Sequence, residues 1–268
     1  MSGTALPTYF LSHGGGPWPW MLDQYGGRYD ALKASLEDIP RQLGGLRPKA
    51  VLVVTAHWEA RQPLISSSPR PPMIYDYGGF PDYTYEIQYS APGSPDVAAR
   101  VQQLLAGAGI AAHLDAQRGF DHGTFSAMQP IYPAADVPIV QLSLKQGLDP
   151  AEHIAIGRAL APLRAEGVLI VGSGLSYHNL RQFGAAGAAA SHEFDAWLRA
   201  SMALPPAERE ARLLAWERAP AARAAHPREE HLLPLMVAHG AASADAAATV
   251  YHEDAFMGSL AVSSFRFG

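Results

Sequence analysis

Histidine is the residue type with the clearest potential for chemistry in this sequence, at 11 of 268 residues. His13, His57 and His178 each follow a short apolar run, and glycine or other small residues stand near them. A fourth, His231, follows two glutamates and precedes an apolar segment. Imidazole is the commonest metal ligand and titrates near neutral pH, so histidines that converge could hold a metal ion or transfer protons.

The apolar runs before these histidines predict buried strands. Short runs rich in β-branched residues are typical of strands covered on both faces. The runs are Thr8–Leu11, the apolar residues that begin the stretch Ala50–Glu59, and Val168–Val171. Open α/β folds place ligand sites beyond the strand ends, so we expect the three histidines and His231 to share one crevice. The alternative is that they are core histidines; each would then need partners for two ring nitrogens, whereas one metal ion satisfies one nitrogen of each.

Three features of the predicted loops support a site at the ends of these strands. Residues 14–16 are glycines, which permit positive φ angles and a close approach of the backbone to a bound molecule. A phosphate-binding loop is the alternative, but neither GxGxxG nor Lys-Ser/Thr follows. The Pro-, Gly- and Tyr-rich stretch Gln62–Gly93 is long for a connection and is interpreted as an ordered loop over a site. His122, in a predicted loop beside Asp121, is a further candidate ligand or acid–base group.

The remaining elements alternate between helices and strands. Helical spacing and capping residues predict helices over Tyr29–Leu43, from Pro95 onward, and over Asp149–Leu163 and Ser191–Met202. A charged, solvent-facing helix is expected over Pro205–Arg218, and an apolar helix is expected to start at His231 within Pro227–Gly240. Further strands are expected at Ile110–Leu114, Pro138–Leu144, Ala247–His252 and Leu260–Phe267. No linker-like change of composition interrupts this order. We therefore predict a single α/β domain over residues 1–268, with three αβα layers and a mostly parallel or mixed central sheet.

Composition limits the partners of such a domain. The chain is 48% hydrophobic and 17% charged, with a formal net charge of -5 and no Lys/Arg cluster, which argues against binding to nucleic acid or to an anionic membrane surface. The absence of cysteine excludes disulfides and thiolate ligands, so a metal site must use His, Asp or Glu. No secretory signal or membrane-spanning run is visible in the sequence, so we expect a cytoplasmic protein. Monomer and homo-oligomer both remain open.

Seven sequence blocks occur in order along essentially the whole chain. They are LSHGGGP (Leu11–Pro17), TAHWE (Thr55–Glu59), GGFP (Gly78–Pro81), YSAPGSP (Tyr89–Pro95), GFDHGTF (Gly119–Phe125), SYHNL (Ser176–Leu180) and EHLLPL (Glu230–Leu235). Together they resemble the DODA-type class III extradiol ring-cleavage dioxygenases, a family related to DOPA 4,5-dioxygenase and to the catalytic subunit of protocatechuate 4,5-dioxygenase.

The resemblance implies roles for individual histidines. His13, His57 and His231 match the metal-binding histidines of the family. His178 matches a fourth, which is either a ligand or the acid–base group, and His122 matches a second histidine that contacts substrate. The protocatechuate branch uses two histidines and a glutamate, so a third histidine here departs from that branch and leaves the metal identity and the charge of the site open.

The same resemblance implies a reaction. A small aromatic diol and O2 would be the substrates, Fe(II) is expected for activity, and Zn(II) can occupy the same kind of site. The product would be a ring-opened compound of the muconic-semialdehyde type. Trp58, Phe120, Tyr177 and the tyrosines of the long loop are expected to wall the aromatic ring, with plain core packing as the alternative. Two other functions remain open: a zinc hydrolase that uses bound hydroxide, and a non-catalytic domain that binds a metal or an aromatic ligand.

Overall fold

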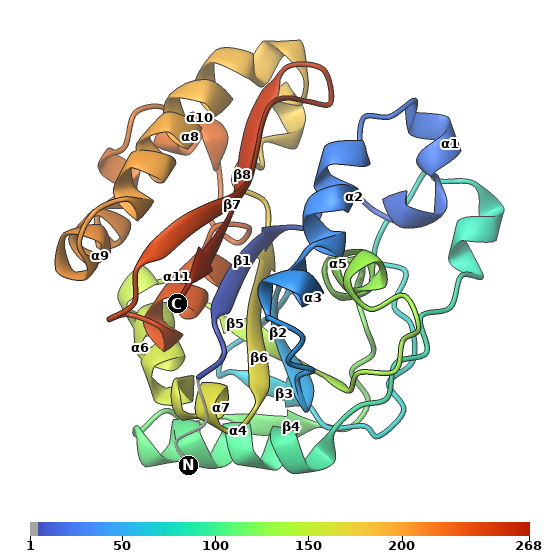
Figure 1. Ribbon diagram of the computed structural model, residues 1–268, viewed down its shortest axis with the longest axis vertical. Helices are drawn as coiled ribbons and strands as arrows, with labels where there is room; N and C mark the ends of the chain where they lie inside the picture. The colour runs from blue at the N-terminus through green and yellow to red at the C-terminus, as the bar shows by residue number, and fades with distance from the viewer. Residues whose placement is uncertain (1–4) are drawn as a thin grey trace.

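The computed structural model describes residues 5–268, and within them one mixed sheet of eight strands lies between two layers of helices (Figure 1). The expectation about a secretory signal falls partly on residues 1–4, which lie outside the described residues. The structure confirms the predicted α/β fold with its mixed sheet.

The sheet has the strand order β4-β3-β5-β2-β6-β1-β8-β7. The strands are β1 (Thr8–Ser12), β2 (Ala50–Ala60), β3 (Leu64–Ser66), β4 (His113–Asp115), β5 (Ile139–Lys145), β6 (Val168–Gly174), β7 (Ala247–Phe256) and β8 (Leu260–Phe267). The four central strands, β5, β2, β6 and β1, are parallel to one another. Antiparallel pairs occur towards the edges, where β3 pairs with β5, β8 with β1 and β7 with β8.

Helices cover both faces of this sheet. The helices are α1 (Leu22–Tyr25), α2 (Asp30–Glu37), α3 (Ile39–Gln42), α4 (Pro95–Gly107), α5 (His122–Ile131), α6 (Pro150–Leu160), α7 (Pro162–Ala165), α8 (Ala188–Met202), α9 (Pro206–Leu214), α10 (Ala222–Ala225) and α11 (Leu233–Ala241). Short 3₁₀ turns add η1 (Trp18–Trp20), η2 (Asp82–Tyr85), η3 (Leu180–Gln182), η4 (Ala185–Gly187) and η5 (Trp216–Arg218). In Figure 1, α2, α3 and α5 lie on one side of the sheet, and α6, α8, α9 and α11 lie on the other.

The carboxyl ends of the central strands meet at one edge of the sheet. Ser12 of β1 pairs with Gly174 of β6, and Thr55 of β2 pairs with Ser173 of the same strand. The residues that follow these pairs therefore emerge side by side. Both β1 and β6 are buried along their whole length, as expected of strands covered by helices on two faces, so they form a rigid base for the loops beyond them.

The structure corrects where two histidines lie. His57 is not at the end of its strand, because β2 continues to Ala60; the pairing with β5 shifts between Val54 and Glu59, and His57 lies within this irregular part. Such shifts re-aim side chains near sites. His122 is not in a loop, because it is the first residue of α5, whose N-cap is Asp121.

Several predicted boundaries also differ. The segment predicted as one helix over Tyr29–Leu43 is divided into α2 and α3 around Asp38, just before Pro40, since proline cannot donate the helical hydrogen bond. The long stretch after β2 contains β3 and η2, so it is not wholly irregular. The region predicted as a solvent-facing helix, α9, carries the buried side chains of Arg209 and Leu213.

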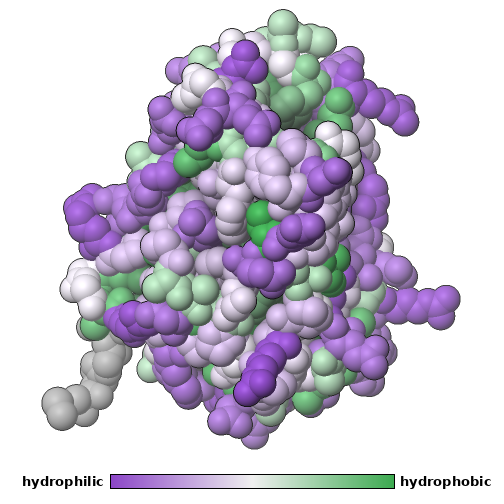
Figure 2. Space-filling model, turned by 90° about the vertical axis from the view of Figure 1, so that its right-hand side faces the viewer, coloured by the Kyte–Doolittle hydropathy of each residue, from purple (hydrophilic) through white to green (hydrophobic). Residues whose placement is uncertain are grey.

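The surface on the side of α2 and α5 is mainly polar. Figure 2 shows this face with hydrophilic residues spread over it and hydrophobic residues in separate small patches. Among the described residues, we find no helix whose length and apolar character would suffice to cross a membrane.

Candidate metal centre and active site

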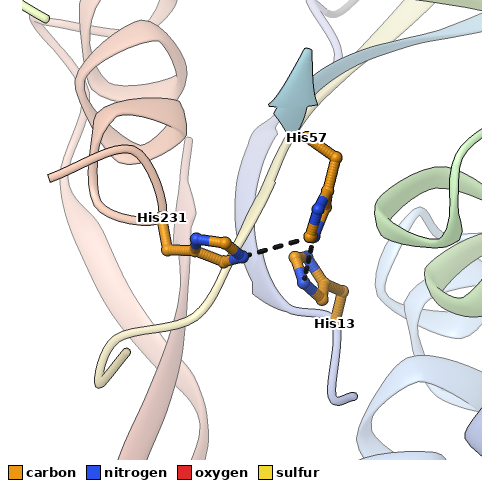
Figure 3. Close-up of side chains that lie close together, drawn as sticks. All are labelled: His13, His57 and His231. Carbon is orange, nitrogen blue, oxygen red and sulfur yellow. Dashed lines mark hydrogen bonds between the residues drawn. The ribbon is translucent and has the colours of Figure 1, made fainter. Parts of the chain in front are cut away.

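Three of the five histidines proposed from the sequence point their Nε2 atoms at one another (Figure 3). The Nε2 atom of His57 is 3.2 Å from that of His13 and 3.2 Å from that of His231. His13 directly follows β1, His57 lies in β2, and His231 stands just before α11. The structure thus brings together residues that are 44 and 174 positions apart in sequence.

Each of these histidines has a polar partner at its other ring nitrogen. The Nδ1 atom of His13 is 3.0 Å from the Ser173 hydroxyl, which itself donates a hydrogen bond to the carbonyl of Gly123. The Ser173 oxygen therefore accepts from His13. Glu230 Oε1 lies 2.9 Å from Nδ1 of His231. These contacts place the proton of each ring on Nδ1 and leave a lone pair on Nε2.

The pKa values of the three rings agree with neutral imidazoles. Burial, together with the neighbouring His57 and His231, holds the pKa of His13 well below its ordinary value. The pKa of His231 is lowered in the same way by burial and by His178 and His57. Burial and His122 lower the pKa of His57 to about 3. Metal ligation requires neutral histidine, so the rings are already in the ligating state.

The nitrogen positions fit one divalent first-row metal ion. Two nitrogens bonded to one ion at about 2.1 Å, at angles between octahedral and tetrahedral, lie roughly 3.0–3.4 Å apart. The observed separations of 3.2 Å fall in that interval. Three lone pairs that face one another repel unless a cation lies between them. The three residues also offer ligand atoms that all lie within 4.8 Å of one another.

His178 lies against this cluster and shares a carboxylate with it. Its ring stacks on that of His231 at a centroid distance of 3.3 Å, and its Nδ1 is 3.1 Å from Glu230 Oε1. Its backbone N–H donates to the carbonyl of Ala225 in α10, which fixes the loop. Burial acts to raise the pKa of Glu230, but the hydrogen bond from His178 and the nearby Arg228 lower it overall, so the carboxylate is ionised.

His122 packs against His57. Their ring centroids are 4.0 Å apart. Asp76, from the segment between β3 and η2, receives hydrogen bonds of 2.9 Å from both the backbone N–H and the Nδ1 of His122, and its other oxygen is 3.3 Å from Nδ1 of His57. Although burial opposes it, hydrogen bonding from His122 lowers the pKa of Asp76 to about 2. One ionised carboxylate therefore orients two histidines.

These side chains line one pocket of about 610 Å³. Its lining residues are His13, Gly14, Gly15, Gly16, Ala56, His57, Glu59, Asp76, Tyr77, His122, Leu175, His178, Leu180, Phe183, Arg228, Glu230 and His231. All five histidines proposed from the sequence are among them. The glycine loop is also there, and Gly14 and Gly16 have the positive φ angles that were expected, +77° and +55°.

Three of the aromatic residues expected to wall the pocket, Trp58, Phe120 and Tyr177, do not line it. Phe120 and Tyr177 are completely buried, and the Tyr177 hydroxyl donates to the carbonyl of Gln182. Trp58 is also buried, with the guanidinium of Arg118 over its ring. Phe120 and Tyr177 have no exposed surface and therefore cannot contact a ligand in this structure. Tyr77, one of the long-loop tyrosines expected there, does line the pocket, together with Leu180 and Phe183, which were not expected.

Sequence reasoning missed the groups that orient the histidines. Ser173 follows a predicted strand, and Asp76 is a single acidic residue among tyrosines, which is a weak signal. Glu230 was noted only as a neighbour of His231, and its contact with His178 bridges 52 positions. Adjacent carboxylates near candidate ligands could have indicated such supporting groups, because ligating histidines commonly donate to carboxylates.

Gly123 offers a test of how tightly the cluster is packed. A Cβ at this position would lie 2.8 Å from both Cδ2 of His57 and Oγ1 of Thr55. We expect Gly123→Ala to displace the His57 ring and to weaken divalent-metal binding about 10- to 100-fold, the usual effect of disturbing groups around ligands. Competition with a chromogenic chelator measures this. Gly107→Ala, at an α4 glycine with open space around it, is the matched control, and equal affinities in the two variants would contradict the packing argument.

Comparison with known proteins gives one consistent result. The family model described as the catalytic LigB subunit of aromatic ring-opening dioxygenase matches residues 7–266. A protein of Beta vulgaris named "4,5-DOPA dioxygenase extradiol" is 39% identical over 97% of this chain and 96% of its own length. A protein of Escherichia coli K12 with the same name is 34% identical over 100% of this chain and 97% of its own. The crystal structure of an uncharacterized protein from Escherichia coli K12 superimposes with a TM-score of 0.78 at 29% identity, covering 98% of this chain and 100% of that one.

Proposed function

The chain belongs to the family of catalytic LigB subunits of aromatic ring-opening dioxygenases, and from this premise we propose that it cleaves a catechol ring in the extradiol position with O2. The observation that carries the proposal is the set of three neutral histidines whose Nε2 atoms meet at 3.2 Å in a pocket large enough for a catechol. The names of the relatives favour a catechol with an amino-acid side chain. The product would be of the muconic-semialdehyde type.

We assign His13, His57 and His231 as the residues that would hold the metal ion. When bound there, Fe(II) would supply a redox-active centre for the reaction of the catechol with dioxygen, whereas Zn(II) has no accessible redox state. Ser173, Asp76 and Glu230 would keep the three rings in the required tautomer and orientation.

The remaining histidines would transfer protons and contact the substrate. The Nδ1–H group of His178 donates to Glu230, so its Nε2 is the atom available to take a proton from a catechol hydroxyl and to return it later. His122, held by Asp76, would donate to or accept from a substrate oxygen near His57. Tyr77 would contact the aromatic ring.

The metal requirement is a direct test of this proposal. We expect the purified protein to bind one divalent ion, and the Fe(II) form to consume O2 and open the ring of a catechol. The Zn(II) form should fill the same site without ring opening, because it cannot pass electrons to dioxygen. Metal analysis, an oxygen electrode and absorbance of the ring-opened product are the measurements. Hydrolysis of a substrate by the Zn(II) form without O2 would favour the hydrolase alternative.

A pocket that binds catechols without turnover in either metal form would favour the non-catalytic alternative. The single domain over residues 1–268, the cytoplasmic location and the oligomeric state, monomer or homo-oligomer, stay predictions.

A further inference from the structure

An ion pair lies in the pocket beside the histidine cluster. Arg228 and Glu59 form a bidentate pair, with Nη1 2.5 Å from Oε1 and Nη2 2.6 Å from Oε2. Among the described residues that line the pocket, Arg228 is the one with a cationic side chain. The pair has no part in the metal-binding and proton-transfer roles proposed above.

Both members of the pair are close in sequence to candidate metal ligands and lie on the same segments as these ligands. Glu59 is two residues beyond His57 on β2, a spacing of about 6.6 Å in a strand, and Arg228 is three residues before His231. The pair therefore bridges two of the elements that carry the candidate metal ligands. The Arg228 side chain is 55% exposed and that of Glu59 is 22% exposed, so a solute that enters the pocket can reach both.

The other carboxylates of the pocket already bind histidines. Asp76 holds His122 and His57, and Glu230 holds His178 and His231. A substrate that carried only a carboxylate would have to displace Glu59 from Arg228 and leave an unpaired anion near Glu230. A substrate that carried only an ammonium group would leave Arg228 with Glu230 at 3.5 Å as its nearest carboxylate.

A zwitterion avoids both losses. Its carboxylate can pair with Arg228 while its ammonium group pairs with Glu59, so one ion pair is exchanged for two and neither protein charge is left alone. Leu180 and Phe183 line the same pocket, are 68% and 39% exposed, and offer apolar surface to the carbon atoms between a ring and its charged end.

We propose that the Glu59–Arg228 pair is the subsite for the α-amino-acid end of the substrate, with Arg228 binding the carboxylate and Glu59 the ammonium group. In the free protein Glu59 and Arg228 pair with each other, and they separate when the zwitterion binds between them. It thereby determines specificity among catechols. The inference rests on the proposed catechol chemistry, which supplies the ring that the histidine cluster holds.

The test measures binding without turnover. The Zn(II)-loaded protein is titrated anaerobically, by calorimetry, with four catechols that differ only in charge: L-DOPA, 3-(3,4-dihydroxyphenyl)propionate, dopamine and 4-methylcatechol. Kd values are expressed relative to 4-methylcatechol. We expect Arg228→Gln to weaken relative binding of L-DOPA and the propionate about 10-fold, and Glu59→Gln to weaken that of L-DOPA and dopamine by a similar factor.

In this pattern each substitution weakens the binding of a different pair of catechols, and L-DOPA belongs to both pairs. A merely structural role of the ion pair would not produce this pattern. Arg100→Gln is the matched control, because Arg100 forms a comparable bidentate pair with Glu166 outside the pocket, and it should leave all four ratios unchanged. Equal losses for all four catechols in Arg228→Gln, or ratios unchanged from the unmodified protein, would overturn the subsite while the catechol proposal stands. Absence of binding by every catechol to the unmodified protein would overturn both.

Discussion

Replacement of His57 by alanine is expected to abolish stoichiometric binding of a divalent metal and, with it, O2 consumption in the presence of catechols. The Nε2 atom of His57 is the one that lies 3.2 Å from both of the other candidate ligand nitrogens, so its loss leaves His13 and His231 without their common neighbour. Two histidines seldom hold a first-row ion tightly, because the chelate then lacks a third protein donor.

The protein should nevertheless remain folded. His57 is partly exposed at the pocket, and its removal takes no large volume from the core. Circular dichroism and thermal unfolding check the fold, and metal analysis after dialysis checks the site. His113→Ala is the matched control, because His113 is an exposed histidine on β4. A fully loaded, folded His57→Ala protein would remove His57 from the proposed site.

The sequence supported prediction of the fold and of the five histidines for a physical reason. Buried parallel strands must be continuous apolar runs, and the ends of neighbouring parallel strands share one edge of the sheet. His13 follows one such run directly. His57 was identified although its strand continues beyond it, because the apolar run, rather than the strand boundary, carries the signal.

Contacts between distant segments could not be predicted in the same way. Asp76 reaches His122 across 46 positions, and no periodicity in a tyrosine-rich loop indicates which residue will do so. The position of His122 in a helix was obscured by Gly123 and by Pro130, both poor helix formers, although Asp121 has the type and spacing of an N-cap. The buried Arg209 of α9 was missed because its charge suggested a solvent-facing helix.

The aromatic residues illustrate a further limit. Trp58, Phe120 and Tyr177 stand beside candidate site residues in sequence, and this proximity suggested contact with substrate. Along a strand, successive side chains point to opposite faces, so a direct neighbour of a site residue often faces the core. Trp58, next to His57 on β2, is buried in this way.

The second large effect is expected for His178→Gln, which should keep the metal and bind catechol but lower kcat on the order of 10²- to 10⁴-fold, the usual contribution of general acid–base catalysis. A glutamine amide can still donate a hydrogen bond to Glu230, as Nδ1 of His178 does at 3.1 Å, but it cannot accept and return a proton. The loss should therefore appear in kcat and much less in KM.

Metal content, anaerobic catechol binding and O2 uptake measured on one preparation of His178→Gln distinguish the possible roles of this residue. His192→Gln, at an exposed position of α8, is the control for the substitution itself. The loss of metal from His178→Gln would identify His178 as a fourth ligand, and its ring does stack on that of the proposed ligand His231 at 3.3 Å. The proton transfer would then be reassigned to His122, because Asp76 fixes its Nδ1 and leaves its Nε2 for the substrate.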